Sequence, residues 1–111
     1  MTMLFAGSFD PITLGHVDII RRACALTDKL VVAVMHNPAK KGAFSLEDRL
    51  SMIRLAVGDM PGVEIAAFDG LLVDFCRQKG ITASVRGIRN TIDYEYETGM
   101  ALANRKLGGL E

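Results

Sequence analysis

Ten residues near the amino terminus, Gly7 to His16 (GSFDPITLGH), combine several groups that can handle a phosphate. Gly7 lets backbone come close to a ligand, and Ser8 supplies a hydroxyl. Gly15 and His16 open a stretch with helical patterning, and the first turn of a helix attracts anions through its free amides and its dipole. A lone His16 is more readily explained as a surface or capping histidine, and Gly7 as an ordinary turn. The combination nevertheless favours an anion site.

Basic and acidic residues farther along the chain extend this pattern. Lys40 and Lys41 lie in a loop after an apolar run, where the alternative is a solvated basic loop. Arg86 directly follows another apolar run, and its guanidinium could clamp phosphate oxygens or pair with Asp93. The acidic segment from Asp93 to Glu97 (DYEYE) suits the first turn of a helix, with or without a ligand.

Strand-like and helix-like segments alternate along the chain and would position these groups. The predicted strands are residues 3–6, 30–35, 63–68 and 81–85, and the predicted helices are residues 15–26, 46–57, 70–78 and 91–107. Ser45 to Asp48 is a variant of the capping box, and Gly80 ends the third helix. The alternation predicts an α/β fold with a doubly wound, Rossmann-like parallel sheet and right-handed crossovers.

In such a sheet, ligands bind beyond the carboxyl ends of the strands, where the strand order reverses. Four loops should therefore matter, and they span residues 7–16, 35–44, 68–72 and 86–93. Three of the four contain the phosphate-handling residues. The sequence therefore predicts a single anion-binding site at this edge of the sheet.

Composition limits the remaining possibilities. The chain has 111 residues, which is enough for one domain, and half of them are hydrophobic, which excludes a disordered chain. The charges of the 13 basic and 13 acidic residues cancel. The chain therefore has no net charge that would attract nucleic acid or an anionic membrane surface. Two cysteines, Cys24 and Cys76, are expected to be buried, reduced thiols in a cytoplasmic protein. Neither a signal peptide nor a membrane-spanning segment is predicted.

The motifs resemble a known enzyme superfamily. Thr13 to His16 (TLGH) resembles the (His/Thr)-x-Gly-His signature of nucleotidylyltransferases, and the longer string from Gly7 resembles the bacterial phosphopantetheine adenylyltransferases. The resemblance covers the whole chain. It continues in NPAKK at 37–41, FSLEDR at 44–49, RGIR at 86–89, DYEYE at 93–97, and Asn104-Arg105.

This resemblance implies adenylyl transfer from ATP to 4'-phosphopantetheine, with Mg²⁺ carried by the ATP and with no metal site formed by protein side chains. His16, Lys40 and Arg86 would be catalytic. The residues implied for the acceptor are Ser8, Lys40, Leu72, Arg86 and Asn104. Those implied for ATP are Gly7, Ser8, Phe9, His16, Gly87, Arg89, Asp93, Tyr96 and Glu97. For Leu71, Leu72 and Asn104, core packing or a polar helix face competes with a binding role.

Members of this family continue past the equivalent of Glu111, with a fifth strand and a Ser-rich segment. We therefore expect residues 1–111 to form a single nucleotidylyltransferase domain that is C-terminally incomplete. Such a domain should bind ATP poorly and turn over slowly. The resemblance also implies a homohexamer. Two alternatives stay open, namely a related nucleotidylyltransferase with another phosphate acceptor and a non-catalytic nucleotide- or phosphate-binding fragment.

Overall fold

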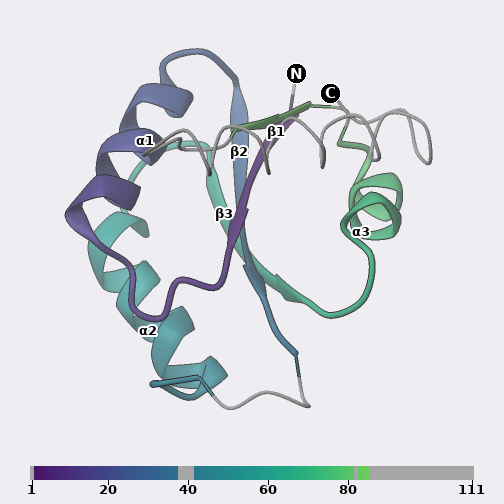
Figure 1. Cartoon of the computed structure of the whole chain (residues 1–111). Coiled ribbons are helices and arrows are strands. Elements are labelled where there is room, and N and C mark those ends of the chain that lie inside the picture. Colours follow the sequence, from purple (N-terminus) through teal and green to yellow (C-terminus); the bar gives the residue numbers. More distant parts are fainter. Residues whose placement is uncertain (1, 38–41, 82, 86–111) are drawn as a thin grey trace, which may run out of the picture.

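A computed structural model describes residues 2–37, 42–81 and 83–85 (Figure 1). The elements are β1 (Thr2–Gly7), α1 (Leu14–Cys24), β2 (Lys29–Met35), α2 (Leu46–Val57), β3 (Val63–Phe68), α3 (Leu72–Lys79) and β4 (Ala83–Val85). Strands and helices alternate as the sequence predicts. The predicted helix at 91–107 and the loop at 86–93 lie outside the described residues. None of the described helices is long and apolar enough to cross a membrane.

The four strands form one sheet in the order β3-β2-β1-β4, and every neighbouring pair is parallel. The chain first moves outward from β1 through β2 to β3, and then returns to add β4 on the other side of β1. The strand order therefore reverses at β1. Right-handed crossovers in the two directions place their helices on opposite faces, so α1 and α2 cover one face and α3 the other (Figure 1). The predicted doubly wound sheet is confirmed.

Alternating strand residues supply the two halves of the core. The cluster beneath α1 and α2 takes Phe5 from β1 and Leu30, Val32 and Val34 from β2, and packs them against helix residues such as Ile20 and Ile53. The cluster beneath α3 takes the intervening residues Leu4, Ala6, Val31 and Ala33. Because successive side chains of a strand point to opposite faces, one apolar run can fill both layers.

Some element boundaries differ from the predictions because of local hydrogen bonds. Helix α1 begins at Leu14, with Thr13 as its N-cap. Helix α3 begins at Leu72 rather than at Gly70, whose φ of 86° is outside the helical range, and it buries Val73 more fully than Leu72. Strand β4 begins at Ala83 rather than at residue 81, because the Ile81 amide donates to Cys76 at the end of α3. Gly80 ends α3 with a left-handed φ of 72°, as predicted.

The two cysteines are free thiols, as predicted, but only one of them is fully buried. Cys76 packs in the cluster beneath α3, whereas Cys24 is half-buried at the end of α1. Burial raises the pKa of each thiol above its ordinary value, because desolvation disfavours the thiolate.

Candidate active site

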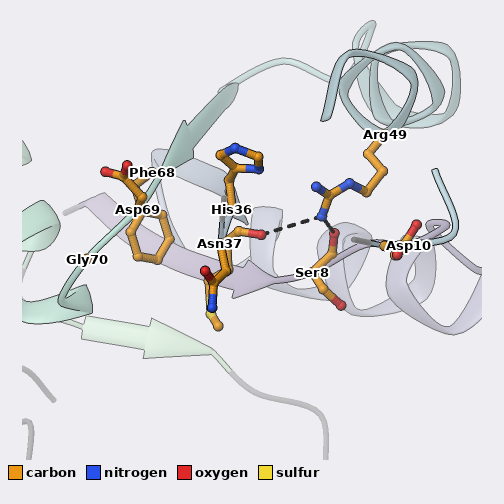
Figure 2. Close-up of a pocket in the computed structure, with 10 residues that line it drawn as sticks. Ser8, Asp10, His36, Asn37, Arg49, Phe68, Asp69 and Gly70 are labelled. Atoms are coloured by element: carbon orange, nitrogen blue, oxygen red, sulfur yellow. Dashed lines mark hydrogen bonds between the residues drawn. The ribbon is translucent and has the colours of Figure 1, made fainter. Parts of the chain in front are cut away.

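A cavity of about 610 Å³ lies at the carboxyl ends of β1, β2 and β3. Three loops and one helix line it, with residues Ser8, Asp10, Met35, His36, Asn37, Gly42, Arg49, Phe68, Asp69 and Gly70 (Figure 2). Three of the four predicted ligand loops thus meet at one place. The fourth, at 86–93, lies outside the described residues.

The loop after β1 is anchored by Phe9. Its side chain is only 1% exposed and makes edge-on ring contacts with Phe5 and His16, with centroids 5.4 and 5.0 Å apart. Phe9 has a φ of 46°, a conformation that bulky residues rarely adopt. A Cβ at Gly7 would lie 3.4 Å from the Phe9 ring, so the ring packs closely over the end of β1. A ligand at this loop could contact Phe9 only through the backbone.

His16 occupies the third position of α1 and closes a reciprocal capping box with Thr13. The Thr13 hydroxyl accepts from the His16 amide at 3.3 Å, and His16 Nδ1 accepts from the Thr13 amide at 2.9 Å. Because Nδ1 accepts a hydrogen bond, the proton of the neutral ring lies on Nε2. The capping histidine considered as an alternative is therefore present. This arrangement also makes Nε2 a donor at a helix N-terminus, so capping and phosphate binding are compatible.

Asp10 joins the first loop to the segment that leads into α2. Its two carboxylate oxygens accept from the amides of Ala43 and Phe44, each at 2.8 Å. The backbone passes so close to this carboxylate that a Cβ at Gly42 would overlap it. The close approach explains why glycine occupies position 42. Asp10 thereby fixes one end of the loop that contains Lys40.

Arg49 is a buried charged residue of α2 with a side chain that reaches the strand ends. It is 7% exposed, and its Nη1 donates to the backbone carbonyls of Ser8 at 3.0 Å and Met35 at 3.5 Å (Figure 2). Its Nε is buried without a hydrogen-bond partner among the described residues. A second buried nitrogen of the cavity lining, His36 Nδ1, also lacks a partner in the described part of the chain.

The structure brings only some of the predicted site residues to the cavity. Ser8 lines it. Gly7 at the end of β1, Phe9 in the following loop and His16 in the first turn of α1 do not. Leu72 packs against the core beneath α3, away from the cavity lining, and Leu71 is 61% exposed rather than buried. The predicted residues outside the described ranges are Lys40, Lys41, Arg86, Gly87, Arg89, Asp93, Tyr96, Glu97 and Asn104.

Of the ten lining residues, only Ser8 is among the site residues predicted from the sequence. The other nine include Asp10, His36 and Arg49. A sequence signal exists for Arg49, because it falls on the apolar stripe of α2, three residues after Leu46 and four before Ile53. A charge on such a stripe indicates a buried partner. His36 follows β2 directly, which places it at the ligand edge of the sheet. Asp10 could not be assigned to its partners, because they lie more than thirty residues away.

Within 2–37, 42–81 and 83–85, no group of three or more histidine, cysteine, aspartate or glutamate side chains could hold a metal ion. A divalent cation at this edge of the sheet would therefore need ligands from a bound substrate or from residues outside those ranges.

The cytidylyltransferase-like family model matches residues 4–111. The chain belongs to this family. It is 52% identical over all 111 residues to the phosphopantetheine adenylyltransferase of Cutibacterium acnes, and it covers 71% of that protein. Over 104 residues it is also 52% identical to the phosphopantetheine adenylyltransferase of Clostridium tetani, of which it covers 65%. The predicted membership of the nucleotidylyltransferases is thus confirmed, and the chain spans about two-thirds of the length of these relatives.

Solved structures with the same fold include more distant proteins. The lipopolysaccharide core biosynthesis protein of Thermoplasma volcanium superposes with a TM-score of 0.69 at 23% identity, over 99% of this chain and 89% of that one. A bifunctional NMN adenylyltransferase/ADP ribose pyrophosphatase of Francisella tularensis superposes with a TM-score of 0.61 at 18% identity, over 91% of this chain and 41% of that one. At these identities the likeness establishes the fold alone.

Proposed function

We propose that the protein transfers an adenylyl group from ATP to 4'-phosphopantetheine, giving dephospho-coenzyme A and pyrophosphate. The observation that carries the proposal is the 52% identity to the phosphopantetheine adenylyltransferase of Cutibacterium acnes across every residue of the chain. The cavity at the carboxyl ends of the strands, where such folds bind ligands, gives independent support.

The chemistry requires positioning rather than proton abstraction. An oxygen of the acceptor phosphate attacks the α-phosphorus of ATP, a new phosphorus–oxygen bond forms, and the bond to the departing pyrophosphate breaks. The attacking phosphate is already ionised near neutral pH, so the reaction needs no general base. The enzyme would align two anions and neutralise the charge that develops on the α-phosphate.

His16 is the residue best suited to that α-phosphate. Its Nδ1 accepts from the Thr13 amide at 2.9 Å, which orients the ring and places the proton on Nε2. The donor would act together with the positive end of the α1 dipole, and no acidic side chain in the first turn of that helix opposes it. Such preorganised donors stabilise charge that builds up in a transition state.

The other residue roles follow the resemblance and stay predictions. Ser8, Lys40 and Arg86 would orient the attacking phosphate, with Leu72 and Asn104 beside the pantetheine arm. ATP would contact Gly7, Ser8, Phe9 and His16 together with Gly87, Arg89, Asp93, Tyr96 and Glu97. Mg²⁺ would be coordinated mainly by the phosphate oxygens of ATP and by water, as this cation prefers.

Assembly and cellular location are further parts of the proposal. We expect a cytoplasmic homohexamer, as the resemblance implies. Several leucines on or next to the helices that cover one face of the sheet are strongly exposed in the single chain. They are Leu14 in α1, Leu26 in the turn after α1 and Leu55 in α2. Contacts between copies would remove such side chains from water. Sedimentation analysis of the purified protein tests this expectation.

The decisive experiment measures pyrophosphate release with ATP and Mg²⁺. Release should require 4'-phosphopantetheine and should stay at background when nicotinate mononucleotide or glycerol 3-phosphate replaces it. Release with one of these other acceptors alone would support a related nucleotidylyltransferase. ATP binding without any release would support the non-catalytic alternative. In the same assay, Lys40→Ala should raise the KM for 4'-phosphopantetheine, while Lys41→Ala serves as the matched control.

A further inference from the structure

Arg49 links β1 and β2 one residue beyond the last pair of their backbone ladder. The last paired residues of these two strands are Gly7 and Val34. The next residues along each strand are Ser8 and Met35, and the carbonyls of both accept hydrogen bonds from Arg49 Nη1, at 3.0 and 3.5 Å. A side chain from α2 thus joins the two strand ends beside the cavity (Figure 2).

Core packing does not account for an arginine at this position. The side chain is 7% exposed, and no carboxylate of the described residues forms an ion pair with it. A buried cation without an ionic partner is unfavourable, and an apolar side chain of similar length would fill the same stripe of α2 without that penalty. What methionine or leucine could not do is donate hydrogen bonds to two backbone carbonyls.

The two carbonyls belong to the loops that the proposed reaction uses. Ser8 itself lines the cavity, and Met35 begins the loop that contains Lys40. Asp10 fixes the far end of that second loop through the amides of Ala43 and Phe44. Arg49 and Asp10 therefore connect the same two loops at two separate points.

We propose that Arg49 is a positioning residue for the acceptor phosphate, which acts through the backbone of Ser8 and Met35. The inference rests on the proposed function, because it concerns how Ser8 and Lys40 are aligned for adenylyl transfer. Nη1 donates to the carbonyls at the two strand ends. Arg49 would therefore affect the substrate indirectly, by holding those strand ends in place. Loss of this link should misalign the attacking phosphate, and small misplacements of reacting groups lower rates strongly.

The test compares Arg49→Met and Arg49→Lys with Arg54→Met in the full-length protein. Arg54 is an exposed arginine of the same helix, so its replacement controls for the loss of a positive charge on α2. Arg49→Met should lower kcat by about tenfold or more while the Kd for ATP changes less than about threefold. Arg49→Lys keeps a donor and should recover part of kcat. Arg54→Met should match the wild type.

A double-mutant cycle separates positioning from general destabilisation. If Arg49 acts through the loop of Lys40, the combined loss in kcat/KM for Arg49→Met with Lys40→Ala should be smaller than the product of the single losses. Losses that multiply would overturn the proposal, as would an unchanged kcat in a folded Arg49→Met protein. Should that variant fail to fold, the cycle is run with Arg49→Lys.

Amide hydrogen exchange gives a readout that needs no activity. Exchange should rise in peptides that contain Ser8 or Met35 when Arg49 is replaced by methionine or lysine, and should stay unchanged in β3 and α3. Uniform changes throughout the chain, or none at these peptides, would contradict the positioning role. If the wild-type protein released no pyrophosphate, the proposed function would fail, while exchange at the strand ends would still test whether Arg49 holds them.

Discussion

The first turns of α1 and α2 begin alike but differ in charge. Each begins with a hydroxyl residue at the N-cap, Thr13 or Ser45, that accepts from the amide three positions on. Leucine follows in both cases. The next two residues are Gly15 and His16 in α1, whereas in α2 they are the acidic pair Glu47-Asp48.

The difference explains why two helices that start at the same edge of the sheet are suited to different tasks. The N-terminus of a helix carries a partial positive charge and several unpaired amides. Glu47 and Asp48 use that charge to stabilise α2 itself. Helix α1 has no acidic side chain in its first turn, so its positive end remains available to an external anion. Helix α2 instead contributes to the cavity through the buried Arg49.

The largest expected effect on kcat distinguishes His16 from Asp48, which are the third residues of α1 and α2. His16→Gln should lower kcat for adenylyl transfer by about a hundredfold, the usual loss for one preorganised donor. Glutamine is a good capping-box residue, so the start of α1 should persist. Asp48→Asn at the equivalent position of α2 is the matched control and should change kcat less than about twofold. Steady-state kinetics of both variants measure these changes. A wild-type kcat for His16→Gln would exclude the imidazole from the mechanism.

Making the first turn of α1 resemble that of α2 should have the next largest effect. Gly15→Asp introduces a carboxylate where a Cβ would lie an ordinary 3.6 Å from Thr13 Oγ1. The added charge should weaken ATP binding by about tenfold, which is about 1.4 kcal/mol. Gly15→Asn keeps the size without the charge and should bind ATP nearly as the wild type does. Calorimetric titration measures both, and equal losses would mean that shape rather than charge matters there.

Removal of the two N-caps should affect stability alike and activity differently. Thr13→Ala and Ser45→Ala should each lower the free energy of unfolding by about 1 kcal/mol. The Thr13 hydroxyl oxygen also lies 3.1 Å from His16 Nδ1 and helps to orient the ring. Only Thr13→Ala should therefore lower kcat, by several-fold. Urea denaturation and steady-state kinetics measure the two quantities. The contrast between the helices would be lost if Ser45→Ala lowered kcat as much.

The smallest expected effect tests the acidic turn of α2. Glu47→Gln removes a carboxylate from the positive end of that helix and should lower the free energy of unfolding by about 0.5 kcal/mol. Its effect should shrink in high salt, because the side chain is exposed. Thermal unfolding at two salt concentrations measures this. If Glu47→Gln instead raised the free energy of unfolding, Glu47 would not stabilise α2 through the helix dipole.

Much of this architecture could be predicted from local patterns. Apolar runs such as Leu30 to Met35 identify strands covered on both faces, and their alternation with helical stripes predicts a doubly wound sheet. Boundaries were less accurate where backbone hydrogen bonds decide them. Ile81 is a residue type typical of strands, yet its amide donates a hydrogen bond to the carbonyl of Cys76 at the end of α3. The sequence predicts a variant of the capping box at Ser45 to Asp48, and the Ser45 hydroxyl does accept from the Asp48 amide. The reciprocal form occurs at Thr13, where His16 completes it.

Local patterns are enough to predict the order of elements, the loops that meet at the ligand edge and the type of helix start that suits an anion. These follow from periodicity and from residue types within a few positions of each other. Contacts between residues that are distant in sequence depend instead on how the strands are arranged in space. Arg49 meets Ser8, 41 residues away, and Asp10 meets Ala43 and Phe44, 33 and 34 residues away. The strand order brings these groups together, and the local patterns, which predict a parallel sheet with right-handed crossovers, do not specify that order.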